Sequence, residues 1–119
     1  MNDYSEAVQH LFADPSHAGA LAGGVAVAVD EQEVRLGLSA AANDGTIIAL
    51  RFQVWGCPHT IATAEAACAA LEGGPATALL EFSAADLMEE LAVPVEKTGR
   101  ILVLEDGFRA LGRALAAAS

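Results

Sequence analysis

The chain has 119 residues, of which 54% are hydrophobic and only 5% aromatic, and this fits a single domain, residues 1–119, that can bury its own core. Its 6 basic and 16 acidic residues give a net charge of −10. An excess of acid excludes the basic surface that binding to nucleic acid or to an anionic membrane requires. It favours solubility and a basic protein partner.

The beginning of the chain, MNDYSEAVQ, has neither the basic nor the apolar part of a secretory signal. No apolar run reaches the roughly 18 residues of a membrane helix, so we expect a cytoplasmic protein. The only cysteines in the sequence are Cys57 and Cys68. If both lie on one helix, this spacing corresponds to roughly 16 Å, which is beyond disulfide reach. Both are therefore predicted to be free thiols, as in a reducing compartment.

The first half of the chain predicts a helix followed by a strand meander. Residues 4–13 have apolar side chains at helical spacing, and the segment 14–24, rich in glycine, predicts a loop. Three segments then alternate in the way of half-buried antiparallel strands: GVAVAVD, EVRLGLS and TIIALRFQVW. Turn residues separate them at 30–32 and 42–45. In the third strand one face is expected to carry Ile48, Leu50, Phe52 and Val54.

The second half of the chain predicts helices. Residues 58–72 begin with a proline and end before a Gly-Gly pair, which is the usual placing of these residues at helix ends. Residues 83–92 begin with a Ser-x-x-Asp pattern and stop before a proline. Residues 98–118 predict a long terminal helix. The expected fold is α+β, with a three-stranded antiparallel sheet packed against about four to five helices.

Cys57 stands between the third predicted strand and the helix after it. In an up-down-up meander the third strand ends where the first turn lies, so Cys57 is expected near Asp30, Glu31 and Gln32. The positive end of a helix favours the thiolate, whereas the two acids disfavour it, so the direction of the pKa shift stays open. Cys57 is therefore either a reactive thiol or a small packed turn residue. Cys68 lies in an apolar stretch and is expected to be buried.

Several segments resemble a known family in their order and spacing. They are YSEAV and HLFADPSHAGAL at the start, NDGTIIALRFQVWGCPHTIATAEA around Cys57, ADLMEELAVPVEK, and ILVLEDGFRALGRAL at the end. Over nearly its full length the chain resembles the NifU/IscU-type iron–sulfur cluster assembly scaffolds, through their N-terminal NifU-like domain. The resemblance implies a SufE/NifU-like fold and a role in cluster assembly. Its implied partners are a cysteine desulfurase or other assembly proteins.

The family's metal ligands are mostly absent. The family holds its cluster with three cysteines, aided by an aspartate and a histidine. The resemblance places the first cysteine on Asp30, the aspartate on Gln32, the middle cysteine on Cys57, and the histidine and third cysteine on Gly99 and Arg100. A cluster needs soft thiolate ligands, usually about four, so a single retained cysteine implies that no cluster is stably bound. Arg100 would also place a positive charge where a metal cation should bind.

Three functions remain open, and none of them is enzymatic. The first is that of a sulfur carrier, which accepts a persulfide sulfur on Cys57. SufE-type proteins act in this way, and their reactive cysteine matches the scaffold's middle cysteine. Alternatively, the protein is a pseudo-scaffold that binds partners without chemistry. The third possibility is a true scaffold whose cluster or zinc ion is completed by other ligands, and for zinc this chain offers Cys57, Asp30 and His59. His10 and His17 are expected to make surface or loop contacts.

Overall fold

The computed structural model of the protein describes residues 5–118. In chain order its elements are α1 (Glu6–Ala13), β1 (Val25–Glu31), β2 (Val34–Asn43), β3 (Thr46–Trp55), α2 (Pro58–Leu71), the 3₁₀ helix η1 (Ala76–Glu81), α3 (Ala85–Glu90), the 3₁₀ helix η2 (Val95–Lys97) and α4 (Thr98–Ala118). The predicted α+β fold is confirmed. Residue 4, where the first helix was predicted to begin, lies outside the described residues.

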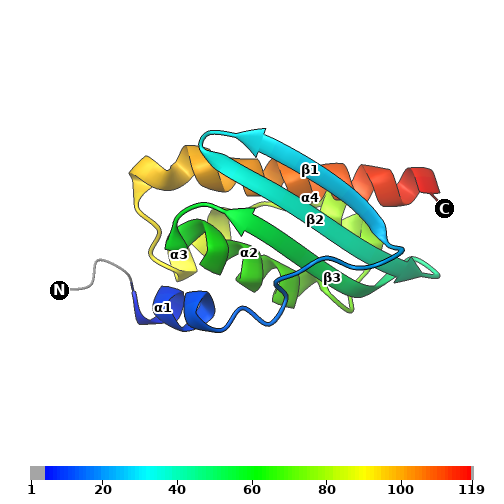
Figure 1. The fold of residues 1–119 in the computed structure, drawn as a ribbon, viewed down its shortest axis with the longest axis horizontal. Helices are drawn as coiled ribbons and strands as arrows, with labels where there is room; N and C mark the ends of the chain where they lie inside the picture. Colours follow the sequence, from blue (N-terminus) through cyan, green and yellow to red (C-terminus); the bar gives the residue numbers. More distant parts are fainter. Residues whose placement is uncertain (1–4, 119) are drawn as a thin grey trace.

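The sheet is an antiparallel meander in the order β1-β2-β3. Helix α4 packs on β1 and β2, α2 packs on β3, and α1 packs on α2. Figure 1 shows α2 and α4 running along one face of the sheet. The core lies between these layers, where Leu36 and Leu38 of β2 and Phe52 of β3 are buried together with Phe108 of α4. None of the helices within residues 5–118 is long and apolar enough to cross a membrane.

The β1–β2 hairpin turn lies later in the chain than predicted. Its two residues are Gln32 and Glu33, with φ angles of 50° and 63°. Two successive residues in the left-handed region form the kind of turn whose twist matches that of the flanking strands. The turn predicted at 30–32 contains Gln32 but begins too early: Asp30 belongs to β1 and pairs with Arg35 of β2. The second turn, at residues 44 and 45, falls within its predicted range.

An irregularity in the β2–β3 pairing changes which side chains of β3 reach the core. The register shifts between Ala41 and Ala42, whose partners are Ala49 and Ile47. The residue that is skipped, Ile48, is 61% exposed, whereas Ile47 is fully buried. The expectation that Ile48 shares the face of Leu50 and Phe52 is thus wrong, because a bulge inverts the alternation on one side of it.

Helix α4 lies close to the sheet because it carries a glycine at the contact. A Cβ atom on Gly107 would lie 2.6 Å from Cδ2 of Leu36 and 3.3 Å from Cδ1 of Leu38. The missing side chain lets the backbone of α4 approach β2.

Candidate functional site: a thiol at a helix start

Cys57, predicted to stand between the third strand and the helix after it, is the N-cap residue of α2, and its thiol is half-buried. Its backbone is extended (φ −79°, ψ 165°), and its carbonyl oxygen accepts hydrogen bonds from the N–H groups of Thr60 (3.0 Å) and Ile61 (3.1 Å). The sulfur atom lies 3.4 Å from the hydroxyl oxygen of Thr60. The thiol is thus held by the first turn of the helix, beside donor groups.

Three segments that are far apart in the sequence meet at this end of the molecule. They are the β1–β2 hairpin turn, the end of β3 and the start of α4, which lie at the left in Figure 1. A Cβ atom on Gly99 would lie 3.7 Å from Oε1 of Gln32. Nη2 of Arg100 donates to Oε2 of Glu33 at 2.7 Å, and the guanidinium of Arg100 is near enough to Cys57 to lower the pKa of its thiol.

The three residues proposed as zinc ligands are not brought together. The carboxylate of Asp30 is 70% exposed and lies 3.6 Å from Nε of Arg35. His59 is only 3% exposed in the first turn of α2. Burial and the charge of Lys97 lower the pKa of its imidazole, although Glu96 acts in the opposite direction. Within residues 5–118 no three histidine, cysteine or acidic side chains form a group that could hold a metal ion.

The surroundings of Cys57 favour its thiolate. Burial raises the pKa of the thiol, but hydrogen bonds from the hydroxyl and the N–H of Thr60 lower it, as do a hydrogen bond from Arg100 and the charge of Lys97. The net result is a pKa below the usual range of a cysteine. The direction that the sequence left open therefore follows first from the hydrogen bonds of Thr60 and then from two cations, which come from η2 and the first turn of α4.

Cys68 has the opposite surroundings, although it lies on the same helix. It is fully buried, as predicted, and it is a free thiol like Cys57. Burial raises its pKa well above the usual range, and the nearby carboxylates of Glu65 and Glu72 raise it further, with only Arg51 acting against them. Cys68 is thus a packing residue whose thiol stays protonated.

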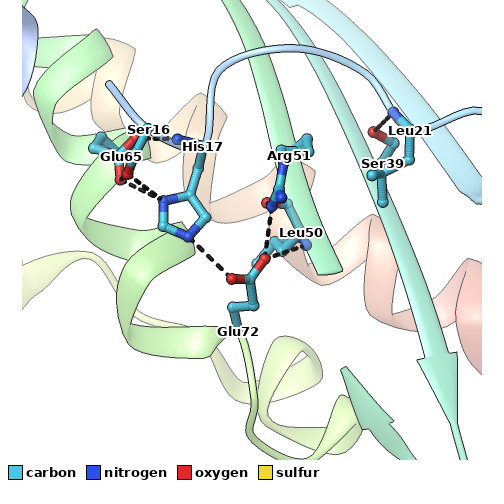
Figure 2. A network of polar contacts seen from close by, with 8 residues as sticks. All are labelled: Ser16, His17, Leu21, Ser39, Leu50, Arg51, Glu65 and Glu72. Atoms are coloured by element: carbon cyan, nitrogen blue, oxygen red, sulfur yellow. Dashed lines mark hydrogen bonds and ion pairs between the residues drawn. The ribbon is translucent and has the colours of Figure 1, made fainter. Parts of the chain in front are cut away.

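A polar network lies along the C-terminal part of α2, and Figure 2 shows its contacts. The buried carboxylate of Glu65 accepts the backbone N–H of His17 at 2.6 Å and lies 2.5 Å from Nδ1 of the same residue. Nε2 of His17 lies 3.2 Å from Glu72. Glu72 also accepts from the N–H of Leu50 at 2.8 Å and from Arg51 at 2.7 Å.

This network ties the segment before β1 to α2 and to the edge of β3. His17 therefore makes the loop contact predicted for it, and His10 is exposed on α1. Hydrogen bonds from Leu50, Arg51 and His17 lower the pKa of Glu72, although burial acts the other way. No local pattern in the sequence predicts the network, because its side-chain partners are 21 to 55 residues apart along the chain.

A three-stranded meander with helices on one face, and a cysteine that caps the helix after the third strand, places the protein in the NifU-like class of α+β domains. The N-terminal part of a nitrogen-fixing NifU-like protein from Brucella abortus superposes with a TM-score of 0.77 at 12% identity, over 97% of this chain and 95% of that one. A putative iron–sulfur cluster assembly scaffold protein for the SUF system from Fervidobacterium islandicum gives 0.73 at 11% identity, over 90% and 94%. A hypothetical protein gives 0.70 at 18% identity, over 89% and 96%.

The sequence itself identifies the family. The chain belongs to the family of NifU-like N-terminal domains, whose sequence profile matches residues 3–117. This confirms the resemblance found in the order of the motifs. No curated protein matches the sequence. The structures above share 18% identity or less with this chain, so their similarity shows the fold alone.

The residues at the site do not fit an iron–sulfur cluster. Among the positions that the resemblance assigns to ligands, Cys57 offers the only thiolate, Gln32 offers a neutral amide and Gly99 has no side chain. Arg100 and Lys97 add two positive charges next to the thiol. A cluster requires several thiolates, and cations beside it would repel iron, so the chemistry of the site is that of one thiol among donors.

Proposed function

We propose that the protein takes part in iron–sulfur cluster assembly as a sulfur acceptor, which receives a sulfur atom on Cys57 and does not hold a cluster itself. The observation that carries the proposal is the position of the Cys57 thiol at the start of α2, half-buried beside the hydroxyl of Thr60 and the guanidinium of Arg100. The family to which the chain belongs supports a role in cluster assembly. Because the chain lacks the family's other ligands, the Cys57 thiol is not expected to serve as a cluster ligand.

The proposed step is a thiol exchange with a cysteine persulfide on the donor protein. The Cys57 thiolate attacks the terminal sulfur of the donor's S–SH group and forms a new S–S bond. The donor's own S–S bond breaks, and its electron pair leaves with the donor cysteine as a thiolate. Cys57 then carries the persulfide, with no net oxidation or reduction. A lowered thiol pKa increases the share of attacking thiolate at neutral pH.

The proposed donor is a cysteine desulfurase, which is the class of enzyme that makes such persulfides. A net charge of −10 suits association with a basic surface. The cationic groups next to Cys57 are local exceptions on this acidic chain, since Lys97 and Arg100 are two of its 6 basic residues. They suit the approach of a negatively charged persulfide.

The test is sulfur transfer from the cysteine desulfurase of the same organism, supplied with cysteine and followed by mass spectrometry under non-reducing conditions. The wild type and Cys68→Ser should gain the mass of a sulfur atom, located by peptide mapping on Cys57. Cys57→Ser should gain none. If the wild type binds the desulfurase but takes up no sulfur, the pseudo-scaffold that binds partners without chemistry replaces this proposal.

Anaerobic reconstitution with iron and sulfide tests the second half of the proposal. The protein should stay colourless and should bind no stoichiometric iron or sulfide, because one thiolate per chain is too few. Visible charge-transfer absorption with matching iron and sulfide contents would contradict it. Such a result would favour a true scaffold whose ligands are completed in another way.

A further inference from the structure

Arg100 forms an ion pair with a residue from a distant part of the sequence. It lies in the first turn of α4, with about a third of its side chain exposed, and its Nη2 atom lies 2.7 Å from Oε2 of Glu33 in the hairpin turn. The two residues are 67 positions apart in the sequence. The same guanidinium lies beside Cys57, where it lowers the pKa of the thiol. Arg100 thus joins the hairpin turn to the thiol.

We infer that Arg100, oriented by Glu33, is a positioning residue that holds the sulfur of Cys57 as an anion, first as the thiolate and then as the charged terminal sulfur of the persulfide. The inference rests on the proposed function, because it assigns to the site a cargo of one chemical class, anionic sulfur. The same positive charge disfavours a metal cation at this site.

The geometry of a guanidinium suits this role. It carries five N–H donors in a rigid plane, so the donor used by Glu33 leaves others for a second acceptor. A persulfide extends the side chain by one S–S bond of about 2.05 Å, which keeps both sulfurs within reach of neighbouring donors of one planar group. A persulfide is also a stronger acid than a thiol, so its terminal sulfur is charged at neutral pH. Lys97 acts on the site through its charge.

Two alkylating reagents that differ in charge test the inference without any sulfur transfer. Iodoacetamide is neutral and iodoacetate is an anion, and both react with the thiolate at the same kind of carbon. The ratio of their rates at Cys57, measured by peptide mass spectrometry at low salt, therefore reports the local charge and cancels changes in thiol reactivity. Arg100→Gln should lower the iodoacetate-to-iodoacetamide ratio about fivefold, which is the effect of one charge a few ångströms away.

The matched variants separate this role from a structural one. Arg100→Lys keeps the charge and should restore most of the ratio. Arg35→Gln removes an equal charge from a side chain that is 70% exposed and paired with Asp30 near the same hairpin, and it should change the ratio by less than about twofold. A ratio in Arg100→Gln that equals the wild-type value, or an equal drop in Arg35→Gln, would overturn the inference.

A second measurement separates failure of this inference from failure of the proposed function. Wild type and Arg100→Gln are loaded with sulfur from inorganic polysulfide, and the loss of the added sulfur from Cys57 is followed by mass spectrometry. The wild-type persulfide should survive several-fold longer. If both persist equally, the Arg100 inference fails while the sulfur-acceptor function stands. If desulfurase transfers no sulfur to the wild type, the proposed function fails, and the alkylation ratio still decides the role of Arg100.

Discussion

The two ends of helix α2 place a cysteine thiol in opposite environments. At the N-terminal end, Cys57 is half-buried, faces the hydroxyl of Thr60 and has Arg100 beside it, and its pKa is lowered. Three turns later, Cys68 is fully buried near Glu65 and Glu72, and its pKa is raised. The opposite pKa shifts of the two thiols come from the deeper burial of Cys68 and from the different hydrogen bonds and charges beside each sulfur.

The two ends of α2 are also expected to differ in what their side chains contribute, which is thiol reactivity at one end and stability at the other. At the first turn of α2, hydrogen-bond donors and cations surround the sulfur of Cys57. The β1–β2 hairpin turn, the end of β3 and the start of α4 meet there. Toward the end of α2, the carboxylates of Glu65 and Glu72 accept hydrogen bonds from the segment before β1 and from β3. Changes at the first end should therefore alter reactivity with little effect on unfolding, and changes at the second end should do the reverse.

The largest effect is expected from Glu65→Ala. The carboxylate is only 4% exposed and accepts the backbone N–H of His17, so its removal leaves buried polar groups of the loop without their acceptor. Such losses cost about 3 kcal/mol, to be measured as a change in the free energy of unfolding by urea. The labelling rate of Cys57 should stay within about twofold of the wild type. Glu89→Ala, an exposed control on α3, should cost less than about 0.5 kcal/mol.

Substitution of each cysteine by alanine should show how differently the two thiols contribute to stability. Cys68→Ala leaves a small cavity in a fully buried site and should lower the free energy of unfolding by about 1 to 2 kcal/mol. Cys57→Ala removes a half-buried thiol and should lower it by less than about 0.5 kcal/mol. Equal losses in urea unfolding would show that Cys57 is a packed turn residue after all.

Acid should weaken the C-terminal end of α2 first. Because the folded-state pKa of Glu72 is lowered, its contribution to stability is complete above the unfolded value of 4.5 and is lost as the pH falls through the folded value. At neutral pH, Glu72→Gln should be about 1 kcal/mol less stable than the wild type. This difference should shrink on titration below the unfolded value. A difference that stays constant with pH would mean that the charge of Glu72 adds nothing.

The smallest effect is expected at Thr60, whose side chain is fully buried. Thr60→Val keeps the shape of the side chain but removes the hydroxyl that lies 3.4 Å from the sulfur of Cys57. Loss of this donor should raise the pKa of the thiol and slow alkylation at neutral pH about threefold. Thr60→Ser keeps the hydroxyl and should react like the wild type. Equal rates in the valine and serine variants would exclude a role for the hydroxyl.

Local patterns predicted most of this architecture. Alternation in the strands, and the proline and Gly-Gly pair that bracket 58–72, led to the correct sheet, helix and N-cap position of Cys57. They could not locate the bulge that exposes Ile48, because a bulge depends on the pairing of two strands. They also placed the hairpin turn too early, since the acidic residues that suit a turn continue β1.

The electrostatics of the site needed the three-dimensional structure. The sequence predicts that Asp30 and Glu31 are the charged residues acting on Cys57, and it indicates Arg100 only as a group that opposes a metal. In the fold Asp30 pairs with Arg35, and Arg100 reaches the sulfur. The lowered pKa of the thiol therefore combines the local hydrogen bonds of Thr60 with the cations Arg100 and Lys97, and only long-range packing brings those cations to the site.

Competitive labelling of the native protein with iodoacetamide shows whether Cys57 is an activated thiol and Cys68 is not. Peptide mass spectrometry should find Cys57 modified first, with a pH dependence shifted below that of the same cysteine in the denatured chain, because its pKa is lowered in the fold. Cys68 should react only under conditions that unfold the protein. If Cys68 is modified first, if both react equally, or if Cys57 titrates above its denatured value, then the start of α2 is not an activated thiol site.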